Sequence, residues 1–150
     1  MSEKKKILVY LLFSALVLCW FACQKDHSTQ PVQSTPYEQW KSFNMHDYTI
    51  HQTRRCFCVY GSLMMKIAVQ SDSISSVVNL SDSNTILPSS FSWYLTIDSL
   101  FRIIQNANKT DSMVVVYNSQ YGYPEKLDLN PQLHPVDGGI LYETSNLEIP

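Results

Sequence analysis

The chain has 150 residues, of which 45% are apolar and 12% aromatic, and it carries 11 lysines and arginines against 13 aspartates and glutamates. A net charge of −2 without a long basic run excludes the electrostatic footprint of a nucleic-acid-binding protein, so we expect no nucleic acid partner. Four glycines and seven prolines are too few for a collagen-like or low-complexity chain, and the aromatic content favours a folded domain.

The N-terminus has the pattern of a secretory signal peptide. Three lysines at positions 4–6 precede an almost uninterrupted apolar run over residues 7–22. That run is shorter than the roughly 20 residues that a membrane-spanning helix needs. We therefore expect cleavage rather than a retained transmembrane anchor.

The apolar run ends in a segment that resembles the lipobox of bacterial lipoproteins, Leu18-Cys19-Trp20-Phe21-Ala22-Cys23. The resemblance implies that residues 1–22 are a lipoprotein signal peptide and that the thiol of Cys23 receives the lipid, which attaches the protein to a membrane. Gln24 in the next position implies the outer membrane of a Gram-negative bacterium, with the protein facing either the periplasm or the cell surface. An ordinary signal peptide that is cut near a cysteine is the alternative.

The rest of the chain divides into a tether and one domain. Residues 23–35 are polar and are predicted to form the tether, and residues 36–150 are predicted to form the domain. The domain opens with a capping box, Thr35-Pro36-Tyr37-Glu38, which predicts a short helix from Pro36 to Asn44. Its aromatic residues are spaced three apart and should form one stripe that packs on a sheet; they are Tyr37, Trp40 and Phe43.

Three strands are predicted after this helix, over residues 47–59, 63–69 and 74–80. A turn cluster at residues 71–73 indicates that the second and third strands form a hairpin, so the three strands should make an antiparallel meander. In the third strand, strict alternation predicts two faces. Val77 and Asn79 should lie on one face, and the opposite face should consist of Ile74, Ser76, Val78 and Leu80.

A turn-rich connection over residues 81–93 leads to a second helix that begins after Thr96 and ends near Asn108. Its apolar residues follow the helical spacing and are Ile97, Leu100, Phe101, Ile104 and Ala107. Three more strands are predicted at residues 113–117, 124–129 and 140–149, and the continuous apolar run of the first predicts a central strand covered on both faces. The order of helix, three strands, helix, three strands predicts an α+β fold with two short helices packed on an antiparallel sheet.

Cys56 and Cys58 are the two thiols expected in the exported domain. On a regular strand their Cα atoms would lie about 6.5–7 Å apart, so a disulfide would require a bulge or a bend. Three interpretations stay open: a small structural disulfide, two buried reduced thiols, and a redox or metal-binding pair. Arg54 and Arg55 could lower a nearby thiol pKa, although a basic pair beside a strand more often forms a solvated face.

No pattern of residues indicates catalysis, a metal centre or a cofactor. The four histidines lack metal-ligand spacing, and neither a nucleophile turn nor a phosphate-binding glycine loop is present. His134 and Asp137 share a loop and could cooperate, but proximity over three residues is weak support for acid-base chemistry. We therefore expect neither enzymatic activity nor a bound metal.

Several short motifs occur in a fixed order: Trp40, Asp47-Tyr48-Thr49, Arg55-Cys56-Phe57-Cys58, Thr96-Ile97-Asp98-Ser99-Leu100-Phe101 with Gln105, Tyr121-Gly122-Tyr123-Pro124, and Asp137 near the end. In this order they resemble the bacterial exported domains of domain of unknown function family 6174, over about residues 37–149. The family has no assigned activity, so the resemblance implies kinship with secreted or lipoprotein-like domains and no specific function. Asn118 and Asn130 stand where the family pattern usually has aspartate, which argues against a calcium site there.

Together these features predict a lipid-anchored protein of the bacterial cell envelope whose domain binds another protein or an envelope component without catalysis. The alternative is a thiol-redox or metal-handling lipoprotein that uses Cys56 and Cys58. A third interpretation is a purely structural lipoprotein, which would differ from the first by lacking a saturable partner.

Overall fold

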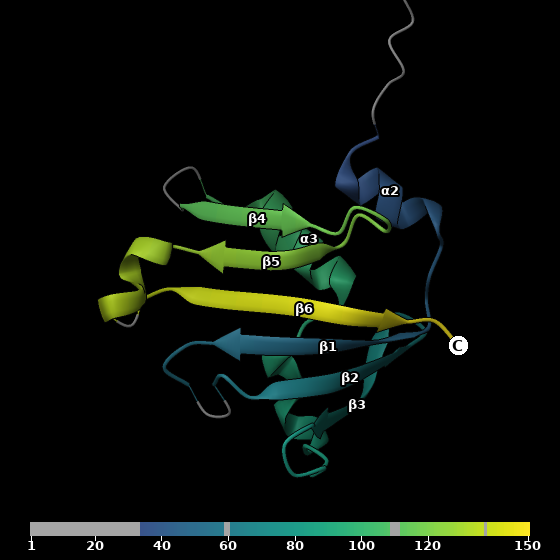
Figure 1. Ribbon diagram of the computed structural model, residues 1–150, viewed down its shortest axis with the longest axis horizontal. Helices are drawn as coiled ribbons and strands as arrows, with labels where there is room; N and C mark the ends of the chain where they lie inside the picture. The colour runs from purple at the N-terminus through teal and green to yellow at the C-terminus, as the bar shows by residue number, and fades with distance from the viewer. Residues whose placement is uncertain (1–33, 59–60, 109–111, 137) are drawn as a thin grey trace, which may run out of the picture. The chain divides into compact units, whose positions relative to one another are not determined.

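The computed structural model describes residues 34–58, 61–108, 112–136 and 138–150 (Figure 1). The predicted signal peptide, the lipidation site Cys23, most of the tether and the motif residue Asp137 lie outside the described residues. Within the described part of the chain, no helix has the length and apolar character that crossing a bilayer requires.

The described residues of the domain contain two α-helices and six strands, which confirms the α+β class. The helices are α2 (Pro36–Ser42) and α3 (Ile97–Asn106). The strands are β1 (Tyr48–Arg55), β2 (Met64–Gln70), β3 (Ser73–Asn79), β4 (Met113–Tyr117), β5 (Pro124–Leu129) and β6 (Ile140–Glu148). The predicted order of helix, three strands, helix, three strands agrees with the structure in outline. The structure adds two 3-10 helices in the connections, η2 (Pro88–Trp93) and η3 (Pro131–Val136).

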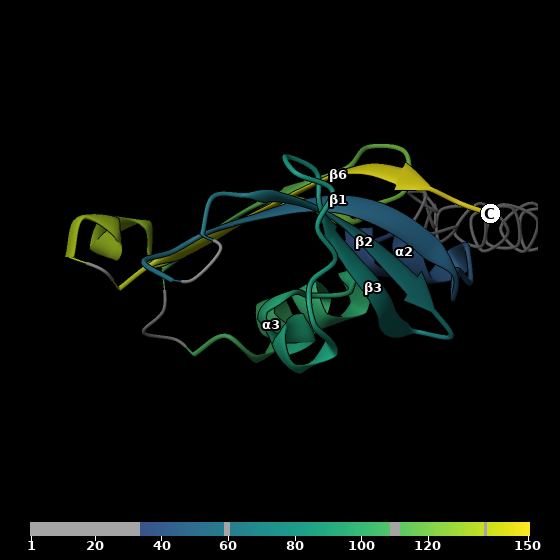
Figure 2. The ribbon, with the colours of Figure 1, turned by 90° about the horizontal axis from the view of Figure 1, so that it is seen from below.

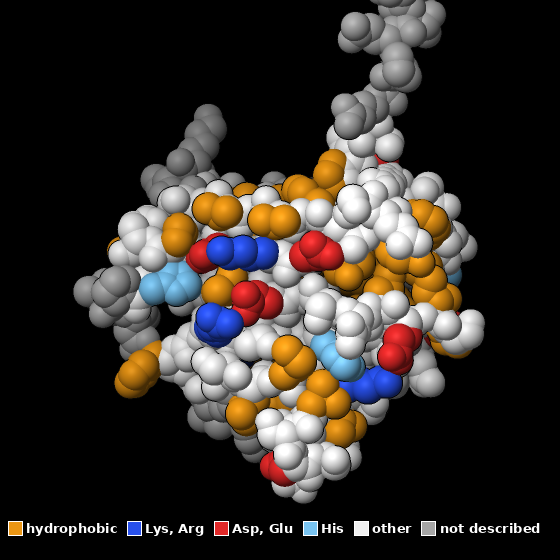
Figure 3. Space-filling view, viewed as in Figure 1, with side chains coloured by type: hydrophobic (Ala, Val, Ile, Leu, Met, Phe, Trp, Pro, Cys, Tyr) orange, Lys and Arg blue, Asp and Glu red, His pale blue; other side chains and the backbone are white. Residues whose placement is uncertain are grey.

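All strands pair antiparallel in one sheet of order β3-β2-β1-β6-β5-β4. The first three strands form the predicted meander. Its β1 edge pairs with β6, so the middle of the sheet joins segments far apart in sequence, as in the pairing of Thr49 with Glu148. Helix α3 lies against one face of the sheet (Figure 2), and neither α-helix covers the other face, which we call the open face (Figure 3).

The prediction that residues 113–117 form a central strand was wrong. The bounds of β4 are as expected, but β4 is the edge strand beyond β5. Val114 and Val116 are 46% and 48% exposed, whereas Val115 packs against the cluster around Leu100 and Leu127. A run of valines is compatible with an edge strand because each second side chain of a strand faces the same side.

The predicted face of the third strand was also wrong. Register shifts between β2 and β3, so that Ala68 pairs with Ser76 and Val69 pairs with Ile74. The bulge leaves Ser75 unpaired and reverses the alternation of side chains. As a result Ile74 and Val77 both reach the core, although simple alternation places them on opposite faces.

Both α-helices begin at the caps that the sequence predicts. The Thr35 hydroxyl accepts from the Glu38 amide at 3.2 Å, and the Thr35 amide donates to the Glu38 carboxylate at 2.8 Å. This backbone hydrogen bond lowers the pKa of Glu38. Thr96 caps α3 in the same way by accepting from the Ser99 amide at 3.1 Å. Helix α2 ends at Ser42, two residues before the predicted Asn44.

The core lies between α3, η2 and the inner face of the sheet. Its larger part includes side chains that are at most 3% exposed, among them Trp40, Tyr48, Ile50, Met65, Ile67, Val69, Val77, Ile97, Phe101 and Tyr123. A smaller part surrounds Leu100, Leu127 and Tyr142. Burial of this kind supplies the dominant favourable free energy of folding.

Candidate functional site

The structure divides the motif residues between two places in the domain. Most of them meet where α2, the start of α3 and the turn before β5 come together; these are Trp40, Tyr48, Asp98, Phe101, Tyr121, Gly122, Tyr123 and Pro124. We call this group the helix junction. Phe57 with its flanking cysteines lies apart from it, beyond the other end of β1.

Trp40 is the centre of the helix junction. The side chain is 2% exposed, and its indole Nε1 donates to Asp98 Oδ1 at 3.1 Å. Its ring meets the ring of Tyr48 edge-on at 5.6 Å between centroids and that of Tyr123 at 6.5 Å. Because the indole is both buried and hydrogen-bonded, Trp40 contributes to stability and presents no free group for chemistry.

Polar side chains on the inner face of β1 hold the beginning of α3. The Tyr48 hydroxyl accepts from the Ile97 amide at 3.0 Å, and burial raises the pKa of this phenol. Gln52, which is 1% exposed, donates to the Leu95 carbonyl and accepts from the Leu95 amide, both at 3.1 Å. These bonds satisfy backbone groups that would otherwise be buried without partners.

The turn before β5 fits closely against α2. Gly122 has a positive φ of 78°, and a Cβ atom at this position would collide with the Pro36 carbonyl oxygen. Gln39 donates to the carbonyls of Ser119 and Gln120 at 3.2 and 3.0 Å. Position 122 therefore requires glycine both for its backbone conformation and for the approach of α2.

Asn118 shapes the same turn. Its side-chain oxygen accepts from the amides of Gln120 and Tyr121, and its side-chain nitrogen donates to Glu125 at 2.8 Å. Asn130, the other position where aspartate is usual, accepts from the Ser112 amide at 3.0 Å. Asn118 thus acts within its turn, whereas Asn130 ties the end of β5 to the residue before β4. The described residues contain no cluster of three metal-binding side chains.

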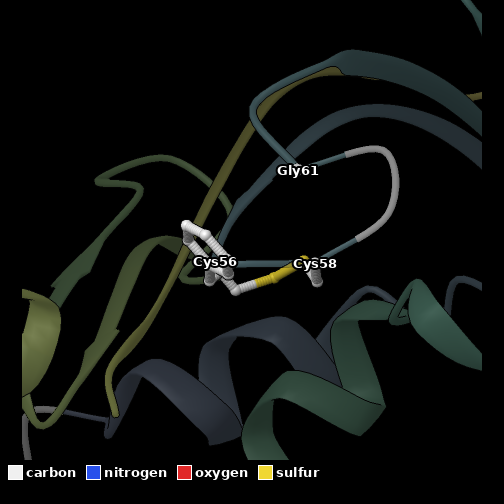
Figure 4. A pocket seen from close by; sticks show the side chains of 4 residues that line it. Cys56, Cys58 and Gly61 are labelled. Atoms are coloured by element: carbon white, nitrogen blue, oxygen red, sulfur yellow. A yellow bond between two sulfur atoms is a disulfide. The ribbon is translucent and has the colours of Figure 1, made fainter. Parts of the chain in front are cut away.

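Cys56 and Cys58 form a disulfide just beyond the end of β1 (Figure 4). Their Cα atoms are 5.3 Å apart, closer than on a regular strand, because the chain leaves β1 at Arg55 and bends. Within the bend the Cys58 amide donates to the Cys56 carbonyl at 2.9 Å, and the Gly61 amide donates to the Cys58 carbonyl at 3.0 Å. A Cβ atom on Gly61 would lie 2.6 Å from the Cys56 carbonyl oxygen, so the bend also depends on glycine.

The bend exposes an aromatic ring. Phe57 is 91% exposed, against 72% for Leu87, the next most exposed of the large apolar side chains in the described residues. A shallow depression of about 490 Å³ is lined by Phe57, the two cysteines and Gly61. We call residues 56–58 with Gly61 the cysteine loop.

Two arginines flank the cysteine loop in different ways. Arg54 Nε donates to Cys56 Sγ at 3.0 Å, and its guanidinium also donates to the Trp93 carbonyl at 3.0 Å. Arg55 instead forms an ion pair with Glu143 at 2.9 Å. Thus Arg54 contacts a cysteine sulfur, whereas Arg55, the next residue of the strand, points to the opposite face of the sheet and pairs with Glu143.

Two further ion pairs lie on strands of the open face. Lys66 meets Glu148 at 3.0 Å, and Lys126 meets Asp128 at 3.7 Å. The hydrogen bond from Lys66, followed by one from Thr49, lowers the pKa of Glu148. Each of these charges has a partner; Lys66, Glu148 and Lys126 are exposed, as expected of a solvated sheet face, whereas Asp128 is only 8% exposed.

His134 lies beside the cysteine loop. Its Nε2 is 2.8 Å from Oδ1 of Asp128, whereas a pairing with Asp137 was the sequence-based suggestion, and residue 137 lies outside the described residues. A small hollow of about 210 Å³ joins His134 and Gly139 to Arg55, Cys56 and Phe57. The loop that carries η3 therefore borders the cysteine loop.

The importance of two side chains was not predicted from the sequence. Gln52 occupies an inward position of a strand whose inward neighbours Tyr48 and Ile50 are buried, and a polar residue at such a position is the signal that could have identified it. For Arg54 the sequence favours a solvated face beside the thiols. Its bonds to Cys56 and Trp93 show that it points inward.

The sequence matches the profile of the family of unknown function DUF6174 over residues 34–149, which includes the helix junction and the cysteine loop. No curated protein and no solved structure gives a significant match. The chain therefore belongs to the family of unknown function DUF6174.

Proposed function

We propose that the protein is a lipid-anchored component of the bacterial envelope whose domain binds another protein through Phe57. The observation that carries this proposal is the 91% exposure of a phenylalanine on a loop closed by a disulfide. Large aromatic side chains in the centre of an interface often supply most of its binding free energy.

The loop geometry supports a binding role for this ring. A disulfide, two backbone hydrogen bonds and the close approach at Gly61 fix the backbone on both sides of Phe57. A side chain on a fixed backbone loses less conformational entropy on binding than one on a mobile loop. Phe57 would insert into an apolar pocket of its partner, with Arg55 and His134 at the rim.

Anchoring by Cys23 rests on the lipobox-like segment Leu18–Cys23. Two or three acyl chains at one terminus would hold the domain near a membrane, because a single chain gives only marginal binding. The polar residues 24–35 would then give the domain room to reach a partner. Radiolabelled palmitate incorporation that is lost in Cys23→Ala would test this part separately.

Site-specific crosslinking in cells tests the binding surface. A photoreactive phenylalanine analogue would replace Phe57 in the full chain, and a matched strain would carry it at Leu87, which is also exposed but lies on the loop before η2. We expect the analogue at position 57 to crosslink to one discrete protein, and the analogue at position 87 to give no such product. An excess of the parent chain without the analogue should reduce the yield of the crosslinked product.

The Phe57→Ser variant, used as the competitor, should no longer reduce the yield of the crosslinked product. Its thermal stability should equal that of the parent, because the exposed ring contributes little to the core. Equal crosslinking from both positions, or competition by the Phe57→Ser variant as strong as that by the parent, would contradict the proposal.

A further inference from the structure

We propose that the Cys56–Cys58 disulfide is exchangeable and accepts two electrons from a dithiol, with Cys58 as the sulfur attacked and Cys56 as the leaving group. The substrate class is a protein or small molecule that carries two neighbouring thiols. The inference goes beyond the binding role of Phe57, because the exchange chemistry itself requires only the two cysteines and Arg54.

The position of the disulfide makes exchange accessible. Cys56 and Cys58 are partly exposed, lie outside the strand ladder and line an open depression (Figure 4). A bond between residues two apart closes a very short loop, so it removes little entropy from the unfolded chain. Burial of the core and the strand ladder, rather than this bond, therefore account for most of the stability of the domain.

The two sulfur atoms have different surroundings. The guanidinium of Arg54 donates to Cys56 Sγ at 3.0 Å. Arg54 is itself held by the Trp93 carbonyl at 3.0 Å, so its orientation does not depend on the disulfide. Of the two sulfur atoms, that of Cys56 is the one that accepts a hydrogen bond from a side chain of the described residues.

This asymmetry selects the direction of attack. A cationic donor stabilises a thiolate, and a sulfur that is stabilised as a thiolate leaves faster during exchange. Arg54 would therefore favour departure of Cys56, which directs an incoming thiolate to Cys58 Sγ.

The exchange balances in two steps. A thiolate of the dithiol attacks Cys58 Sγ, a mixed disulfide forms, and the electron pair of the broken Cys56–Cys58 bond leaves on Cys56 Sγ beside Arg54. The second thiol of the substrate, as a thiolate, then attacks the substrate's first sulfur in the mixed disulfide, and Cys58 is released as a thiolate. The two protons lost by the dithiol pass to Cys56 and Cys58, so the substrate is oxidised to a disulfide and the loop is reduced to two thiols.

The site of attack can be measured directly on the exported full chain purified without reductant. A brief reaction with reduced glutathione at pH 8, stopped with acid, would leave the mixed disulfide on the tryptic peptide of residues 56–66. Fragmentation of that peptide locates the adduct. We expect glutathione mainly on Cys58, and an adduct mainly on Cys56 would overturn the proposal.

Two arginine variants supply a matched comparison. Arg54→Gln should slow reduction by dithiothreitol by roughly threefold or more, because the leaving sulfur loses its stabilising donor. Arg55→Gln, next to it in sequence but paired with Glu143, should react at nearly the parental rate. Arg54→Lys, which keeps the positive charge, should recover part of the rate, and the site of glutathione attack tests the assignment in the parent chain if Arg54→Gln does not fold. A parental rate in a folded variant that lacks the charge at position 54 would refute the assignment.

Discussion

The indole Nε1 of Trp40 and the carboxylate of Asp98 are joined by a hydrogen bond of 3.1 Å that links α2 to the first turn of α3. The other carboxylate oxygen lies 3.5 Å from Lys41 Nζ, also in α2. A carboxylate in a first turn interacts favourably with the helix dipole. Asp98 therefore stabilises its own helix and also holds the neighbouring one.

Two substitutions at Asp98 should separate these effects. Asp98→Ala leaves the buried indole N–H without a partner and should lower the free energy of unfolding by about 1–3 kcal/mol. Asp98→Asn keeps an acceptor oxygen and loses only the charge, so a loss of under about 1 kcal/mol is expected. Urea unfolding followed by tryptophan fluorescence measures both, and equal losses would show that the hydrogen bond is unimportant.

Gly122→Ala should destabilise the helix junction. The positive φ and the approach of the Pro36 carbonyl both oppose a Cβ atom at this position, so we expect a loss of about 1–3 kcal/mol. Ser119→Ala in the same turn is the control, because its side chain is exposed and its carbonyl remains available to Gln39. Comparison of their thermal unfolding tests the claim, which fails if the two variants unfold alike.

The phenol of Tyr48 should make the domain sensitive to alkali. Burial raises its pKa above the ordinary value near 10, so its contribution to stability is complete below about pH 10 and is lost as the pH rises toward the higher value of the folded state. Burial also raises the pKa of Tyr117, Tyr123 and Tyr142, which should act in the same direction. Unfolding free energies measured from pH 8 to 11 should therefore decline at the upper end.

Tyr48→Phe should have two measurable effects. At neutral pH the Ile97 amide loses its acceptor, which should cost about 1–3 kcal/mol. The decline in stability above pH 10 should become shallower, because one of the shifted phenols is gone. Tyr37→Phe, at an exposed ring in α2, is the control for removal of a hydroxyl, and an unchanged alkaline slope in Tyr48→Phe would contradict the assignment.

Neighbouring valines test whether one face of β4 is exposed. Val116→Glu places a carboxylate opposite Lys126 on an exposed position and should change stability by less than about 1 kcal/mol. Val115→Glu places the same group in the cluster with Leu127 and should cost several times more. A strand covered on both faces, as predicted from the sequence, would tolerate neither substitution, so the ratio of the two losses tests whether one face of β4 is exposed.

Local features of the fold could be predicted from the sequence, since they depend on neighbouring residues. Thr35 with Glu38 and Thr96 with Ser99 form caps because the groups involved are three residues apart. The bounds of β4 and β5 follow from an apolar run and from alternation in the same way.

Features that depend on distant segments could not be predicted. The sequence of β4 does not reveal that no described strand pairs with its outer side, and alternation in β3 does not reveal the bulge at Ser75. The inward direction of Arg54 depends on Trp93, which comes from another element. For the cysteine loop, spacing indicated that a disulfide needs a bend, but exposure of Phe57 follows only from where β1 ends.

The central position of β6 has a consequence for the order of folding. During synthesis β1, β2 and β3 are complete long before β6 exists, and until then β1 presents a free strand edge. Such edges pair readily with other chains, and contacts between distant segments form slowly. The nascent domain should therefore depend on chaperones that shield this edge, and removal of the last strand should split the sheet into two halves rather than shorten it.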